Sequence, residues 1–67
     1  MKLIINGQTR DFECESLPLD QLLNSLGLEG RPVVVELDRE PVLPMDLGST
    51  IVRDGSSLEI VTIAAGG

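Results

Sequence analysis

The part of this sequence best suited to chemistry is its ending, Ala64-Ala65-Gly66-Gly67. At an average glycine usage of ~7%, two terminal glycines arise by chance in about one chain in 200. One explanation is a frayed end, because termini that are not tied down are usually disordered. The other is a tail with a role of its own, for which the terminal pair is a clue but not a proof. The residues alone leave both explanations open.

The other reactive side chains do not predict a catalytic site. The sequence has no histidine, no glycine-rich nucleotide loop and no cluster typical of a metal site. Its single cysteine, Cys14, stands between two glutamates and two residues after Phe12, whereas reactive cysteines need an exposed, electropositive setting. We therefore expect Cys14 to be an inert core thiol, and we do not expect the protein to be an enzyme.

Composition and charge exclude several classes of protein. Sixty-seven residues suffice for one domain, and five basic against eleven acidic residues give a formal net charge of -6. Nucleic acid is an unsuitable partner for so acidic a chain, because affinity for it comes largely from basic side chains. The acidic exterior either keeps the protein soluble or favours a basic protein partner.

The sequence also contains no recognisable membrane or export signal. No stretch approaches the ~20 apolar residues of a membrane helix, and the N-terminus lacks the pattern of a signal peptide. One cysteine cannot form an internal disulfide, which agrees with a reducing compartment. We expect a cytoplasmic protein that is a monomer when free.

The first half of the chain is predicted to form two strands and a helix. Residues 1–5 are an apolar strand, and Asn6-Gly7 is a strong signal for a type I′ hairpin turn into a second strand over residues 8–15. Phe12 and Cys14 would share one face of that strand. Leucines at the i, i+3, i+4, i+7 spacing then predict a helix with one apolar stripe, namely Leu19, Leu22, Leu23 and Leu26.

The second half is predicted to complete a sheet. Residues 31–37 hold three consecutive valines and predict a central strand buried on both faces. A short edge strand over 41–44, an irregular connection over 45–50, an apolar pair at 51–52 and a last strand over 57–63 follow. One sheet over one helix is the economical arrangement, because the leucine stripe needs an apolar face to cover. We predict an α+β fold of β-grasp topology, with a mixed four- to five-stranded sheet packed on one main helix and the first and last strands parallel.

The order and spacing of these segments resemble one known family over the whole chain. The segments are "MKLIINGQ", "LDQLLNSLGL", "VVVELDREPVLP" and "IVRDGSSLEIVTIAAGG", and together they resemble the ThiS-type sulfur carriers of the ubiquitin-like β-grasp superfamily. The chain departs from the common family pattern at Met45, at Leu47-Gly48, at Ser56, and at Ala65, where many relatives have a third glycine. These departures bear on which enzymes the protein fits.

The resemblance implies a specific chemistry for the ending. In such carriers an ATP-dependent, ThiF-like adenylyltransferase joins the terminal carboxylate to AMP, and sulfur from a donor protein converts it to a thiocarboxylate. A ThiG-like thiazole synthase then takes the sulfur for the thiazole of thiamine. By this resemblance residues 1–67 are one β-grasp domain with a flexible tail over about 64–67. Gly67 is the reacting residue, Gly66 and Ala65 lead to it, and the domain itself binds no cofactor.

Two alternatives remain at this point. The sulfur could serve molybdopterin or cysteine biosynthesis, or the chain could be a β-grasp binding module without carrier chemistry. A partner surface is expected where alternation along the last strand turns side chains away from the helix: Val61 and Ile63, with Val34 beside them. Those residues could equally be present for strand propensity alone. Leu58 and Ile60 would face the core.

Overall fold

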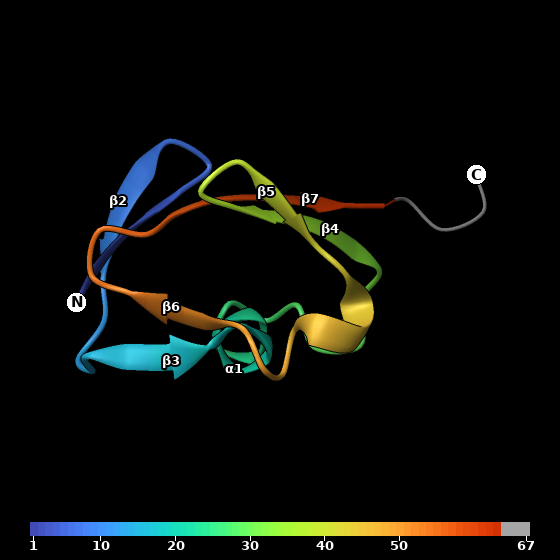
Figure 1. The fold of residues 1–67 in the computed structure, drawn as a ribbon, viewed down its shortest axis with the longest axis horizontal. Helices are drawn as coiled ribbons and strands as arrows, with labels where there is room; N and C mark the ends of the chain where they lie inside the picture. Colours follow the sequence, from blue (N-terminus) through green and yellow to red (C-terminus); the bar gives the residue numbers. More distant parts are fainter. Residues whose placement is uncertain (64–67) are drawn as a thin grey trace.

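The computed structural model describes residues 1–63 as one sheet packed on one helix, with a smaller two-stranded ribbon beside the helix (Figure 1). The elements, in chain order, are β1 Lys2–Ile5, β2 Gln8–Asp11, β3 Ser16–Pro18, α1 Leu19–Ser25, β4 Val33–Leu37, β5 Glu40–Val42, the short 3-10 helix η1 Pro44–Asp46, β6 Ile51–Arg53 and β7 Ser57–Thr62.

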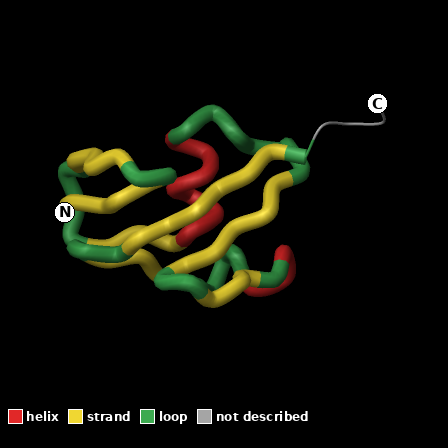
Figure 2. The backbone as a smooth tube through the Cα atoms, turned by 90° about the horizontal axis from the view of Figure 1, so that it is seen from above, coloured by secondary structure: helices red, strands yellow, loops and turns green. Residues whose placement is uncertain are grey.

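The main sheet has the strand order β2-β1-β7-β4-β5, and only its β1–β7 pair is parallel. This confirms the predicted mixed sheet with the first and last strands side by side. β3 and β6 pair antiparallel in the second, two-stranded sheet. Seen from above, α1 runs beneath the strands of the main sheet, on one side only (Figure 2). Within residues 1–63, nothing covers the opposite face of the main sheet (Figure 1), which is called the uncovered face below.

The core lies between this sheet and α1. Nine hydrophobic residues are buried there: Leu3, Ile5, Leu19, Leu22, Leu23, Val35, Val52, Leu58 and Ile60. Leu58 and Ile60 thus face the helix, as strand parity predicts, and the leucine stripe is confirmed except at its last position. Leu26 is the C-terminal cap of α1 and is only half-buried.

The start of α1 is held by backbone rather than by a capping side chain. Pro18, at the N-cap position, makes no side-chain hydrogen bond and ends β3. The Leu19 amide donates to the carbonyl of Thr50 at 2.8 Å, and the Asp20 amide donates to the carbonyl of Leu47 at 3.2 Å. The loop before β6 therefore satisfies amides that a helix start leaves without partners. The pairing of β3 with β6, which brings this loop into place, was not predicted from the sequence.

Two sequence predictions about individual strands are wrong. The second strand ends at Asp11, so Phe12 and Cys14 lie beyond it, both half-buried. The N-terminal ammonium group of Met1 donates to the carbonyls of Phe12 and Cys14 at 2.7 and 2.9 Å, and the Phe12 amide donates to the Met1 carbonyl at 2.9 Å. The Met1–Phe12 bonds extend the β1–β2 pairing by one residue pair. The strand does not continue to residue 15, because residues 16–18 pair with β6 in the second sheet.

The second error concerns the strand with the three valines. β4 lies inside the sheet, between β7 and β5, but it is not buried on both faces. Val35 is 2% exposed, whereas Val34 is 51% exposed and Glu36 is also exposed. The physical reason is that α1 covers one face of the sheet and nothing in residues 1–63 covers the other. The predicted edge strand is β5, and the predicted irregular connection contains η1.

Candidate functional site: the uncovered sheet face and the end of the last strand

The uncovered face of the sheet carries an apolar pair close to the end of β7. Val34 on β4 lies directly opposite Val61 on β7, and Val61 is 59% exposed. Next to them Glu36 lies opposite Glu59, and both carboxylates are exposed. Apolar surface bordered by like charges is thus presented to solvent where the chain leaves the sheet. Two of the three residues expected as a partner surface are brought together here.

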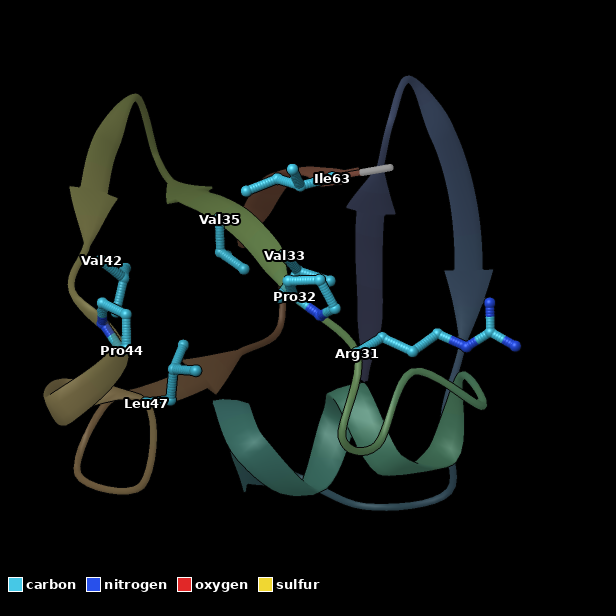
Figure 3. Close-up of a pocket in the computed structure, with 8 residues that line it drawn as sticks. All are labelled: Arg31, Pro32, Val33, Val35, Val42, Pro44, Leu47 and Ile63. Carbon is cyan, nitrogen blue, oxygen red and sulfur yellow. The ribbon is translucent and has the colours of Figure 1, made fainter. Parts of the chain in front are cut away.

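The third such residue, Ile63, lies one position beyond β7 and is 52% exposed. Its amide donates to the carbonyl of Pro32 at 3.0 Å, which continues the β4–β7 pairing past the last strand residue. Ile63 also borders an apolar groove on the helix side of the sheet, together with Val33 and Val35 (Figure 3). The last described residue is therefore fixed to the sheet by a hydrogen bond and borders two surfaces.

The residues predicted to react lie outside the described part of the chain. The sequence continues from Ile63 through Ala64 to these three residues, Ala65, Gly66 and Gly67. What the structure defines is the element that precedes them, the central strand of the sheet.

Two polar side chains extend the pairing of β7, one on each of its edges. On the β1 edge the Asn6 side-chain amide donates to the carbonyl of Ile60 at 3.0 Å, and its Oδ1 accepts from the Ile60 amide at 2.8 Å. On the β4 edge the Asp38 amide donates to the carbonyl of Ser57 at 2.7 Å, and Asp38 Oδ1 accepts from the Ser57 amide at 2.9 Å. Together with the β4–β7 pairing and the Ile63–Pro32 bond, the β4 edge is thus paired from Ser57 to Ile63.

Both of these residues sit in turns with left-handed backbone, Asn6 at φ 51° and Asp38 at φ 49°. Asn and Asp tolerate this conformation better than most side chains. The sequence predicts the turn at Asn6-Gly7, but it does not predict the bonds that either side chain makes to β7. The short polar side chain at each turn was the only local signal for them.

Within residues 1–63 no group of three or more His, Cys, Asp or Glu side chains could hold a metal ion. Cys14 is free and half-buried. No helix in this part of the chain is long and apolar enough to cross a membrane.

Comparison with known proteins agrees with this architecture. The model of the ThiS family matches residues 3–67, which is nearly the whole chain. The chain belongs to the ThiS family. It is 32% identical over 63 residues to the sulfur carrier protein ThiS of Thermus thermophilus, covering 94% of this chain and 95% of that protein.

Another relative places a ThiS-like segment inside a larger protein. A thiazole synthase of Paramagnetospirillum magneticum is 42% identical to this chain over 67 residues. The match covers 100% of this chain but 20% of that protein, so the chain spans about a fifth of the length of this relative.

Solved structures of the ThiS family share the fold. The crystal structure of the thiamine biosynthesis protein ThiS from Geobacter metallireducens superposes with a TM-score of 0.87 at 32% identity, covering 100% of both chains. A solution structure of a thiamine biosynthesis protein from the same organism gives a TM-score of 0.83, also at 32% identity, and covers 100% of this chain and 88% of that one. The predicted ubiquitin-like β-grasp fold is confirmed.

Proposed function

We propose that this ThiS-family protein is a sulfur carrier of thiamine biosynthesis and that sulfur travels on the carboxyl carbon of Gly67. The observation that carries the proposal is the family match through residue 67, together with the likeness to the T. thermophilus sulfur carrier over 95% of its length. The names of the relatives favour thiamine over molybdopterin or cysteine biosynthesis as the destination of the sulfur.

The proposed chemistry begins with activation of a poor electrophile. The Gly67 carboxylate attacks the α-phosphate of ATP in a ThiF-like adenylyltransferase, which forms a mixed anhydride with AMP and releases pyrophosphate. A persulfide on a donor protein then attacks the carbonyl carbon, and AMP leaves, which gives an acyl disulfide. A thiolate next attacks the donor-side sulfur of this S–S bond, so that the thiocarboxylate of Gly67 leaves and a disulfide forms between the thiol and the donor. ATP belongs to the activating enzyme, so the carrier itself needs no cofactor.

The domain contributes recognition to this scheme. Gly66 and Ala65 are small enough to follow Gly67 into a narrow active site, because glycine lacks Cβ and alanine adds one methyl group. Ordering such residues on binding costs roughly 1–2 kcal/mol each. Affinity must therefore come from the folded part of the chain. The Val34–Val61 pair on the uncovered face, with Ile63 beside it, is the proposed docking surface for the adenylyltransferase.

The acceptor of the sulfur in this proposal is a ThiG-like thiazole synthase. The P. magneticum thiazole synthase supports it, because a segment of that enzyme is 42% identical to this whole chain. The carrier acts in the cytoplasm as a free monomer and catalyses no step itself.

Intact-mass spectrometry tests the central step. Incubation with a ThiF-like enzyme, ATP and a sulfur donor is expected to raise the mass of the protein by the difference between one sulfur and one oxygen atom. A variant without Gly66 and Gly67 should take up no sulfur yet melt at the same temperature as the parent protein. An unchanged parent mass, with an enzyme that converts its own carrier under the same conditions, would exclude the proposal.

A further inference from the structure

An apolar groove opens on the helix side of the sheet, next to the end of β7. It has a volume of about 300 Å³. Five aliphatic residues line it, Val33, Val35, Val42, Leu47 and Ile63, and two prolines complete its walls. Figure 3 shows Ile63 and Val35 on one side of the groove, with Leu47 across from them and Val42 at the flank. The groove is separate from the Val34–Val61 pair, which lies on the other face of the sheet.

The chemistry of the walls suits a protein side chain better than a metabolite. Small-molecule sites combine apolar walls with several converging polar groups. Here the only charged lining residue is Arg31, which is exposed and extends away from the aliphatic residues in Figure 3. An apolar side chain fits inside the groove, and a carboxylate next to it would meet the guanidinium group at the rim.

The position of Ile63 limits how far from the groove an enzyme that holds the end of the chain can be. Four residues, 64–67, follow it, and four residues span at most roughly 14 Å. If sulfur travels on Gly67, as proposed above, any enzyme that holds this carboxyl group must stand within about that distance of Ile63. The groove wall is therefore within reach of each enzyme that handles the tail.

We propose that the groove receives an apolar side chain, with a neighbouring carboxylate, from the thiazole synthase that accepts the sulfur. The inference rests on the proposed carrier function. The synthase is chosen over the activating enzyme because the P. magneticum thiazole synthase contains a segment related to this whole chain. Burial of the aliphatic walls by that side chain removes apolar surface from water, which favours association.

Two variants test the groove from different sides. Leu47→Phe places a larger side chain where the partner's side chain would enter, and Arg31→Glu reverses the charge at the rim. Ile51→Phe adds the same aromatic bulk on β6, outside the groove, and Arg39→Glu makes the same charge reversal at the opposite end of β4. These two substitutions are the matched controls.

Binding of the unmodified protein to the thiazole synthase of the same organism is measured by calorimetric titration. Leu47→Phe is expected to weaken binding about ten-fold or more, equivalent to about 1.4 kcal/mol, without lowering the melting temperature. Arg31→Glu should weaken it roughly three- to ten-fold, with a reduced dependence on salt. Both controls should bind like the parent protein. Binding of both groove variants within about two-fold of the parent, or no binding of the parent at all, would overturn the proposal.

The intact-mass measurement separates this inference from the proposed function. If the parent protein takes up sulfur normally but the groove substitutions leave synthase binding unchanged, the groove is excluded as a docking site and the carrier function stands. If the parent protein takes up no sulfur, the carrier function is excluded, whatever the groove variants do to binding.

Discussion

The side chain of Asn6 connects the first hairpin to the central strand of the sheet. Its amide makes two hydrogen bonds with the backbone of Ile60, a residue 54 positions away in the sequence. The Asn6 side chain therefore takes the place of one more backbone residue of β1 and lengthens the β1–β7 pairing by one residue pair. The Asn6-Gly7 pattern predicts the turn, but a local pattern carries no information about so distant a partner.

We predict that Asn6→Gly lowers the free energy of unfolding by about 1–3 kcal/mol, since two hydrogen bonds contribute about 0.5–1.5 kcal/mol each. Glycine keeps the left-handed backbone of this position, so the loss reports the side-chain bonds rather than strain. Urea unfolding followed by circular dichroism measures it. Gly7→Asn, in the same turn, is the comparison for a change of turn residue without loss of those bonds. A stability of Asn6→Gly equal to that of the parent protein would contradict this role.

At the scale of elements, β4 shows where sequence reasoning succeeds and where it fails. Three consecutive valines predict a strand, and the structure has one there, inside the sheet. Strand alternation placed Val34 on the face away from the helix, but the run of valines wrongly predicted burial on both faces, because burial depends on how much of the sheet the helix covers. α1 has seven residues and packs on one face, so Val35 is buried and Val34 is exposed.

The same dependence on distant parts of the chain explains the other element errors. β3 and β6 have three residues each, too short to show a period, and they form only as a pair. β7 was predicted accurately because its alternation matches its environment, with Leu58 and Ile60 inside and Val61 outside. The chemistry expected of Gly67 came from likeness to a family, and no element of the described chain could have supplied it.

Valine-to-threonine substitutions along β4 should separate the two faces of the sheet. Val35→Thr buries a hydroxyl group without a hydrogen-bond partner and is expected to lower the free energy of unfolding by about 1–3 kcal/mol. Val34→Thr, one residue away and exposed, should change stability by less than about 0.5 kcal/mol. It should nevertheless raise the KM for the carrier in adenylation, because it removes apolar contact from the proposed docking surface. Thermal melts measure the effect on stability, and adenylation kinetics measure the effect on KM. An unaltered KM for the double variant Val34→Thr/Val61→Thr would contradict the assignment of that surface.

The whole molecule carries six negative charges in excess, and the fold places some of them against one another. Glu36 and Glu59 face each other across two neighbouring strands, which disfavours the folded state by roughly 0.2–1 kcal/mol. The carboxylates beside the apolar pair on the uncovered face thus lower the stability of the folded protein slightly. A basic partner surface would gain from the same arrangement, since it would relieve the repulsion on binding.

Salt should therefore stabilise the free protein. Raising sodium chloride from about 10 mM to about 150 mM shortens the Debye length from about 30 Å to about 8 Å and screens the excess negative charge. We expect the melting temperature to rise by a few degrees, because about 1 kcal/mol corresponds to roughly 4–8 °C in a domain of this size. Glu59→Gln removes one member of the facing pair, so it should raise the melting temperature at low salt and reduce the rise that salt produces. A melting temperature that falls with sodium chloride, or a Glu59→Gln protein with the salt response of the parent, would show that repulsion on this face does not limit stability.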